Sequence, residues 1–467
     1  MRELTHPAAA GFGRSTMPAK GTPRRTTYSR RITPVPRGGY ERHRNVCIYG
    51  LIRDGAAEPS VDPMKRNRRI SAVAALALAA LVTGTGTGFA ATTTQSATPV
   101  ATHAFDTEPA AATAPTRSFH GTLPAPTGPY AAGEEIIHLT DTSRLDPWVP
   151  SSGPRQLTVT MVYPAVPGTG TPAPYMTLAE AAGIIQHRKL PASSGITPQT
   201  LSSVTTHAFD GARPQHGRHP LVVLSAAAEN PRMMLTSLAT ELVSHGYVVA
   251  LVGHTYEDTG ETLANGETPP CAICDPPETI DFNAETTSRA RDVSFVIDQL
   301  THGNTAWRLA HLIDKHEIGM AGHSLGGATA AATMIADPRV RAGVDMDGTF
   351  FPAPEPGQIN RPFLMLGRAD GHTPGSGGDD IVWKQAWDAL GGYKKWLTVV
   401  GADHFDFADG DVLQEQAGFP TAPLSPERGV EITREYVTAF FDQTLKGIHS
   451  PLLDGPSPNN PEVLFHS

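Results

Sequence analysis

The chain has 467 residues, with 37 Lys and Arg against 46 Asp and Glu, and its formal net charge is −9. The charge is uneven, because residues 1–69 carry 15 basic and 5 acidic side chains, whereas the remainder carries 22 and 41. An acidic main part disfavours binding to nucleic acid and to anionic lipid, so we expect no nucleic-acid partner.

A secretory signal peptide is predicted for residues 64–90. A basic segment, Met64 to Arg69, precedes an uncharged and mostly apolar run of 14 residues, and small residues follow up to Ala90. The apolar run is too short to span a bilayer, so we expect cleavage and secretion rather than stable membrane insertion. The pair Arg68-Arg69 also fits twin-arginine export, and the sequence leaves the export route open.

The segments beside this signal are expected to lie outside the fold. Residues 1–63 are rich in Arg, Pro, Gly and Thr, and we interpret them as a non-native upstream extension translated from a wrong start site; the alternative is a basic nucleic-acid-binding tail. Residues 91–120 are rich in Ala, Thr and Pro and are predicted to be a disordered lead-in. Residues 121–467 contain no linker-like break and are expected to form one monomeric domain.

Strands and helices alternate through this domain. The period-two pattern of residues 157–163 predicts an edge or antiparallel strand, and continuous apolar runs predict parallel strands that are buried on both faces. The apolar runs are 220–224, 247–252, 318–321, 340–344, 362–366 and 396–400, with helices predicted at 233–243, 285–300, 328–332, 379–390 and from the cap Ser425 onward. This order predicts an α/β fold with a mainly parallel central sheet and helices on both faces. Ligands of such sheets bind beyond the carboxyl ends of the strands.

The two cysteines of the domain, Cys271 and Cys274, form a Cys-x-x-Cys pair in a proline-flanked loop. No βαβ start surrounds the pair as in a thioredoxin-like redox motif, and no further ligands at zinc-site spacing lie nearby. We therefore predict a small structural disulfide, as suits an exported protein. No metal spacing, phosphate loop or dinucleotide motif is present, so we expect neither metal nor cofactor.

The segment Gly322-His323-Ser324-Leu325-Gly326-Gly327 carries the strongest functional signal. It follows an apolar run and precedes an alanine-rich helix, which is the strand–turn–helix context of a G-x-S-x-G nucleophile elbow. Glycine is needed where the turn leaves no room for a side chain. The sequence therefore predicts that Ser324 is a nucleophile at the carboxyl edge of the sheet.

A serine nucleophile needs a general base, and that base needs an orienting acid, in the chain order Ser, Asp or Glu, His for this type of fold. His404 follows the last core strand and is the expected base, ahead of His372, which follows an earlier strand. Asp347 and Asp370 each follow a strand and are both candidates for the acid. The residues alone leave that choice open.

The oxyanion hole requires two backbone N–H donors. We expect the first from Leu325, directly after the serine, and the second from the loop after strand 220–224, at Ala228 or alternatively Ala227. His254 and His323 are candidate pocket residues, but for His254 we favour the alternative of a structural histidine bonded to a loop carbonyl. Three further residues are expected to form ion pairs on a helix surface or strut contacts: Arg289, Arg291 and Asp292.

Four segments resemble the platelet-activating-factor acetylhydrolase-like group of α/β-hydrolases. They are Leu123–Tyr130, Val162–Pro164, Gly322–Thr329 and Asp347–Pro352, and the similarity spans about residues 121–447. In that group the acid follows the strand directly after the elbow helix, so the resemblance implies Asp347 rather than Asp370. The oxyanion loop departs from the group, because it has Ala226-Ala227-Ala228 where a glycine is usual.

The expected activity is that of a secreted serine ester hydrolase, a lipase or esterase acting through Ser324, His404 and Asp347. The expected substrate is a small-molecule or lipid carboxylic ester; the sequence does not decide the acyl chain or the alcohol. Because of the three alanines, a non-catalytic binding protein on a hydrolase scaffold is one alternative. A serine amidase or peptidase is another.

Overall fold

The computed structural model describes residues 119–274 and 281–467, all of which fall within one compact unit. The predicted signal peptide and upstream extension lie outside the described residues. The described chain starts at Phe119, whose ring is buried. No helix within the described ranges is long and apolar enough to cross a membrane.

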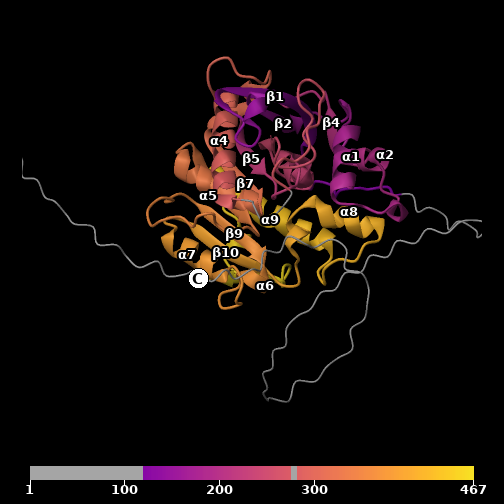
Figure 1. Ribbon diagram of the computed structural model, residues 1–467. Coiled ribbons are helices and arrows are strands. Elements are labelled where there is room, and N and C mark those ends of the chain that lie inside the picture. Colours follow the sequence, from indigo (N-terminus) through magenta and orange to yellow (C-terminus); the bar gives the residue numbers. More distant parts are fainter. Residues whose placement is uncertain (1–118, 275–280) are drawn as a thin grey trace, which may run out of the picture. The chain divides into compact units, whose positions relative to one another are not determined.

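One mixed sheet forms the centre of the fold (Figure 1). Its strand order is β11-β10-β9-β8-β7-β5-β6-β2-β1-β4-β3, and the six strands from β10 to β6 in that order are all parallel. β2 is antiparallel to both of its neighbours, as predicted. The strands are β1 (Ala131–Leu145), β2 (Pro154–Ala165), β3 (Thr171–Pro172), β4 (Ala208–Asp210), β5 (His219–Ser225), β6 (Val248–His254), β7 (Ile313–His323), β8 (Val340–Met346), β9 (Phe363–Arg368), β10 (Lys394–Val399) and β11 (Val463–His466).

Helices follow most of the parallel strands. The described α-helices are α1 (Leu178–His187), α2 (Pro198–Ser202), α3 (Thr236–Ser244), α4 (Phe282–Thr301), α5 (Leu325–Ala336), α6 (Ala369–His372), α7 (Asp380–Ala389), α8 (Asp409–Ala417) and α9 (Pro426–Leu445). The Ser425 side chain caps α9, as predicted, by accepting from the Arg428 N–H, and Pro426 occupies the first turn of the helix.

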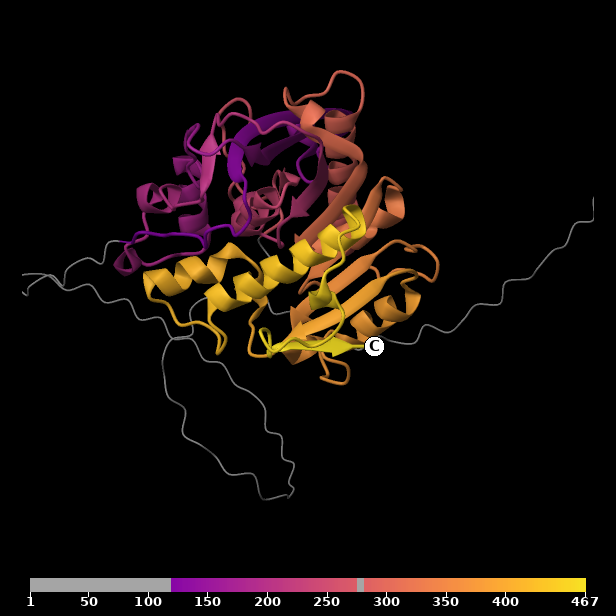
Figure 2. The ribbon, with the colours of Figure 1, turned by 180° about the vertical axis from the view of Figure 1, so that it is seen from behind.

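Alternate residues of the parallel strands supply two hydrophobic cores, one on each face of the sheet. Val222 and Leu224 of β5 face α3 and α9, whereas Leu221 and Val223 face α4 and its neighbours. Viewed from behind, α9 crosses in front of the sheet (Figure 2). The predicted architecture, a mainly parallel sheet with helices on both faces, is therefore confirmed.

The sequence missed several elements near the ends of the sheet. The long strand β1, the short strands β3, β4 and β11, and the helices α1, α2 and α8 were not predicted. These elements have mixed polarity; β1, for example, alternates irregularly between buried and exposed positions. They extend or cover the sheet without changing the order of its parallel centre.

Candidate active site

Ser324 lies at the bend between β7 and α5, in the predicted strand–turn–helix. β7 ends at His323 and α5 begins at Leu325, so the serine alone forms the bend, with φ 56° and ψ −120°. A positive φ is strained for a residue other than glycine, and such strain is typical of nucleophile elbows. The Ser324 N–H donates to the Met346 carbonyl at 2.8 Å, which holds the bend against the end of β8. Ser324 is half-buried.

Close backbone packing explains the glycines around Ser324. A Cβ on Gly322 would clash with the Gly326 carbonyl, and a Cβ on Gly326 would clash with the carbonyl oxygen of Ser225 at the end of β5. A side chain on Gly327 would meet the buried Asp345 carboxylate. The elbow helix therefore begins in direct contact with the chain that leaves β5.

His404 and Asp347 are joined by a hydrogen bond. His404 begins a short 3₁₀ helix (His404–Phe407) after β10, and Asp347 directly follows β8. His404 Nδ1 lies 2.5 Å from Asp347 Oδ2. The Asp347 side chain is fully buried, whereas that of His404 remains 21% exposed. The imidazole is thus anchored on one side and open on the other.

Asp347 is surrounded by further donors and cationic groups. Arg368 donates its backbone N–H to Oδ1 and its Nη1 to Oδ2, each at 2.6 Å. His372, which is buried, places Nδ1 at 3.1 Å from Oδ1. Burial alone would raise the pKa of the Asp347 carboxyl, but His372 and His404 hold that pKa well below its usual range. Because an ionised carboxylate only accepts, Nδ1 of His404 carries the proton and Nε2 can accept one.

The other candidate acid, Asp370, does not share this position. It lies in the short α6 beyond β9, in a non-helical conformation, and its side chain is exposed. Within the described ranges, Asp347 is the carboxylate that bonds the His404 ring. The geometry agrees with the residue that the family resemblance implied.

His323 supports the segment that carries His404. The two imidazole rings lie 4.8 Å apart, and His323 Nε2 donates to the His404 backbone carbonyl at 2.6 Å. Burial lowers the pKa of His323 to about 3, so its ring is neutral at physiological pH. His323 was a candidate pocket residue. The structure buries it beneath the His404 segment.

The loop after β5 has its carbonyls bonded to the protein. The Ala226 carbonyl accepts from Arg289 Nη1 at 2.7 Å, the Ala227 carbonyl from the Asn230 backbone N–H at 3.2 Å, and the Ala228 carbonyl from Asn230 Nδ2 at 2.8 Å. Among the described residues, no hydrogen-bond acceptor is found for the N–H groups of Ala227 and Ala228. This loop contacts the start of α5 at Gly326, so it lies beside the N–H of Leu325.

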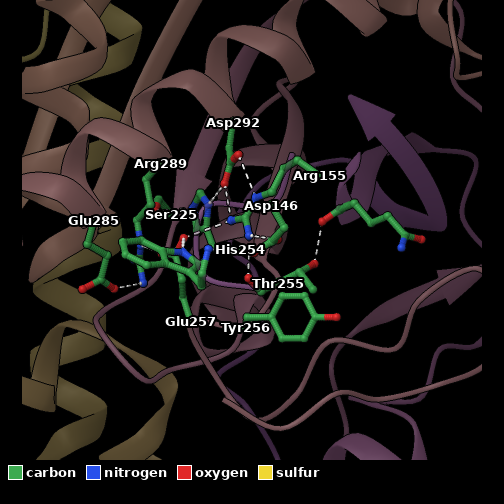
Figure 3. A network of polar contacts seen from close by, with 12 residues as sticks. Asp146, Arg155, Ser225, His254, Thr255, Tyr256, Glu257, Glu285, Arg289 and Asp292 are labelled. Atoms are coloured by element: carbon green, nitrogen blue, oxygen red, sulfur yellow. Dashed lines mark hydrogen bonds and ion pairs between the residues drawn. The ribbon is translucent and has the colours of Figure 1, made fainter. Parts of the chain in front are cut away.

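His254, at the end of β6, belongs to a buried polar network (Figure 3). Its Nε2 lies 3.0 Å from the Ser225 hydroxyl and its Nδ1 lies 2.8 Å from Asp292 Oδ2. His254 is therefore a structural histidine, but it bonds a hydroxyl and a carboxylate, and the expectation of a loop carbonyl as its partner was wrong. Both ring nitrogens are already paired, and the ring is buried, so it offers neither nitrogen to a ligand.

Of the two roles expected for Arg289 and Asp292, that of ion pairs on the helix surface was wrong, and their buried contacts to other elements correspond to the other role, strut contacts. The Arg289 and Asp292 side chains of α4 are 1% and 0% exposed, whereas Arg291 is exposed. Arg155 of β2 also reaches the network and bonds Asp292, Glu257 and Asp146. Sequence reasoning missed these buried partners because β2, β6 and α4 are far apart in the chain.

Two groups of side chains have the spacing of metal ligands within the described ranges. His254, Glu257 and Asp292 form the first, but Arg155 and Arg289 already balance its carboxylates. The second combines His187 and Glu229 with Cys274, whose sulfur is bonded to Cys271. The predicted disulfide between these cysteines is confirmed.

Comparisons with known proteins identify ester hydrolases as similar to this chain. A family model described as platelet-activating factor acetylhydrolase, isoform II, matches residues 289–446. A probable 1-alkyl-2-acetylglycerophosphocholine esterase from Arthroderma benhamiae is 27% identical over 385 residues, covering 73% of this chain and 93% of that protein. The platelet-activating factor acetylhydrolase of Bos taurus is 25% identical over 247 residues. That match covers 45% of this chain and 52% of the bovine protein.

A solved structure extends the similarity to nearly a whole chain. The ferulic acid esterase from Streptomyces cinnamoneus is 38% identical with a TM-score of 0.66, covering 74% of this chain and 99% of that one. Together with the sheet order and the elbow, these matches define an α/β-hydrolase that is a carboxylic ester hydrolase. Among those enzymes, the chain belongs to the platelet-activating-factor acetylhydrolase-like group.

Proposed function

We propose that the protein hydrolyses carboxylic esters with Ser324 as nucleophile, His404 as general base and acid, and Asp347 as orienting acid. The observation that carries the proposal is the hydrogen bond between His404 Nδ1 and the buried Asp347, beside the strained elbow of Ser324. It favours the tautomer in which Nε2 accepts the serine proton. An isolated serine hydroxyl is a poor nucleophile near neutral pH, so this base is required.

The reaction then proceeds in two halves. The Ser324 oxygen attacks the ester carbonyl carbon while its proton passes to His404 Nε2. Collapse of the tetrahedral intermediate breaks the bond to the alcohol oxygen, which takes the proton from His404 and leaves. A water molecule then gives a proton to His404 while its oxygen attacks the acyl-enzyme, and collapse of the second intermediate breaks the bond to the Ser324 oxygen, which takes the proton back from His404. The products are the carboxylic acid and the free serine.

The oxyanion of both intermediates is assigned to the N–H of Leu325 and the N–H of Ala228, with Ala227 as the alternative donor. Support comes from the loop beside α5, whose carbonyls are bonded elsewhere while these alanine N–H groups have no acceptor among the described residues. The N-terminus of α5 adds a favourable partial positive charge at the same place. Preorganised donors of this kind usually supply the largest single contribution to acyl-transfer catalysis.

For the substrate, we propose a carboxylic ester with a short acyl group, either in a phospholipid or in another small ester. The relatives are named for an acetyl ester of a glycerophosphocholine and for a ferulic acid ester. Rates on a series of acyl chain lengths, measured beside an acetylated glycerophosphocholine and a feruloyl ester, would choose between them. A preference for long acyl chains would contradict the proposal.

We further propose that the mature enzyme is exported. The support is the basic and apolar pattern of residues 64–90, and the disulfide between Cys271 and Cys274, which suits an oxidising compartment. Terminal sequencing of the secreted enzyme should give a start close to Ala91. A mature start upstream of Met64 would contradict this proposal.

The catalytic assignment is tested by replacing single serines. Ser324→Ala should lower turnover of p-nitrophenyl acetate by about 10⁴-fold or more, by analogy with other triads. Ser203→Ala is the matched control, because Ser203 is exposed at the end of α2 and should keep full activity. Full activity in Ser324→Ala would end the proposal.

A further inference from the structure

A buried chain of hydrogen bonds runs from β2 to the end of β5 (Figure 3). Arg155 donates to Asp292, Asp292 accepts from His254 Nδ1, and His254 Nε2 accepts from the Ser225 hydroxyl. The donor directions follow from the chemistry. Asp292 is an ionised acceptor, so the His254 proton lies on Nδ1 and the Ser225 hydroxyl must donate. Every member is buried, and Ser225 is the residue directly before the three alanines.

Arg289 joins this chain to the alanine loop. Its Nε donates to Glu257 at 2.6 Å, its Nη2 to Glu285 at 3.0 Å, and its Nη1 to the Ala226 carbonyl at 2.7 Å. Glu257 also accepts from Arg155 at 2.9 Å, so one carboxylate ties the two guanidinium groups together. A planar guanidinium with three fixed partners has little freedom to rotate.

Bonding a carbonyl fixes the N–H at the other end of the same peptide group. The peptide is planar and trans, so its N–H points opposite to its carbonyl. The Ala226 carbonyl held by Arg289 therefore orients the N–H of Ala227, and the Ala227 carbonyl held by Asn230 orients the N–H of Ala228. These are the two N–H groups considered for the oxyanion hole.

We propose that Arg289 is a positioning residue for the oxyanion hole, backed by the chain Ser225–His254–Asp292–Arg155, and that it acts through the Ala226–Ala227 peptide, whose N–H is the alternative donor beside that of Ala228. The inference rests on the proposed function and adds to it the device that fixes the hole. A glycine would let this loop adopt the required conformation by itself. In this chain, hydrogen bonds from α4 side chains hold the alanine loop in place instead. Burying so many charges is a poor way to gain stability, because desolvation offsets the attraction. A fixed loop geometry accounts for the arrangement.

The test compares two arginines of the same helix. Arg289→Met removes the donor to the Ala226 carbonyl, and Arg291→Met is the control because Arg291 is exposed. Arg289→Lys keeps the buried charge but cannot reach all three partners, so it provides the folded variant should Arg289→Met not fold. Ser225→Ala removes only the hydroxyl that bonds His254. Each variant is assayed for kcat and KM on p-nitrophenyl acetate and for binding of a trifluoromethyl ketone, whose adduct places an oxyanion in the hole.

We expect kcat of Arg289→Met or Arg289→Lys to fall about 10- to 100-fold, less than the loss of an entire oxyanion donor, while KM changes less than about twofold. Affinity for the ketone should fall by the same factor as kcat. Ser225→Ala should show a smaller loss of kcat, and Arg291→Met none. Unchanged kcat and ketone affinity in Arg289→Lys would overturn the inference while leaving the proposed function intact. An active Ser324→Ala enzyme would overturn the proposed function itself.

Discussion

Replacing Asp347 by asparagine tests the assignment of the acid with almost no change in shape. In the folded protein the carboxylate accepts from His404 Nδ1, from Arg368 Nη1 and from the Arg368 backbone N–H. An amide has one acceptor oxygen, so it cannot satisfy donors at both positions. If its NH₂ faces His404, the ring must accept at Nδ1 and carry its proton on Nε2. That tautomer cannot take the serine proton.

The expected size of the effect follows from this tautomer change. The same substitution in a serine protease triad lowers kcat by about 10⁴-fold, which corresponds to about 5.5 kcal/mol of transition-state stabilisation. Asp370→Asn is the matched control, because Asp370 is exposed and lies outside the His404 contact. Its kcat/KM should stay within about twofold of the wild-type value, since surface substitutions have small effects.

The assay is the initial rate of p-nitrophenyl acetate hydrolysis near neutral pH, with the melting temperature of each variant measured in parallel. A large loss of kcat in Asp347→Asn without a loss of folded protein is the predicted result. If Asp370→Asn were the impaired variant and Asp347→Asn remained active, the reasoning from the hydrogen bond would be refuted and the role would pass to Asp370.

Three further perturbations have defined outcomes. Gly326→Ala would drive a Cβ into the carbonyl at the end of β5, so melting temperature and activity should both fall. The control is Gly410→Ala in α8, which has open space around it and should be neutral or stabilising by up to about 1 kcal/mol. Equal melting temperatures in the two variants would contradict the clash. Burial raises the pKa of Asp409 in the folded protein to about 7, above its ordinary value of 3.8. The contribution of Asp409 to stability is therefore fully present below about pH 4 and is lost as pH rises through 7, because the unfolded chain ionises this carboxyl at a lower pH than the folded protein does. Asp409→Asn should therefore gain stability relative to wild type between about pH 5 and pH 8 in urea unfolding, by at most about 4 kcal/mol, and parallel pH curves would refute it. Replacing Cys271 and Cys274 together by serine should cost about 2 kcal/mol of unfolding free energy, because the disulfide closes a very short loop, and an unchanged urea midpoint would contradict this.

Much of the fold could be predicted because its signals are local. The apolar runs of the parallel strands, the cap at Ser425 and the glycines around Ser324 each act within a few residues. The strand β1 was missed because its polar and apolar residues alternate irregularly over 15 residues. Its pairing with β2 is a long-range contact that compensates for this weak pattern.

The site shows the same division between local and long-range information. The spacing made Ser324 and His404 the candidate nucleophile and base, yet Asp347 and Asp370 looked equivalent because both follow a strand. Their difference arises only when β8 and β9 pair and bring the backbone N–H of Arg368 onto Asp347. Arg289 could not be recognised as buried either. A charged residue on an amphipathic helix usually faces water, and its partners Glu257 and Ala226 lie on other elements.

Covalent labelling of Ser324 tests the central claim most directly. A fluorophosphonate reacts only with a serine that is activated by a base and supported by an oxyanion hole. After incubation with the probe and digestion, the wild-type enzyme should carry one label, on the peptide that contains Ser324, and Ser324→Ala should carry none. An unlabelled wild-type enzyme, or a label on another serine, would contradict the account.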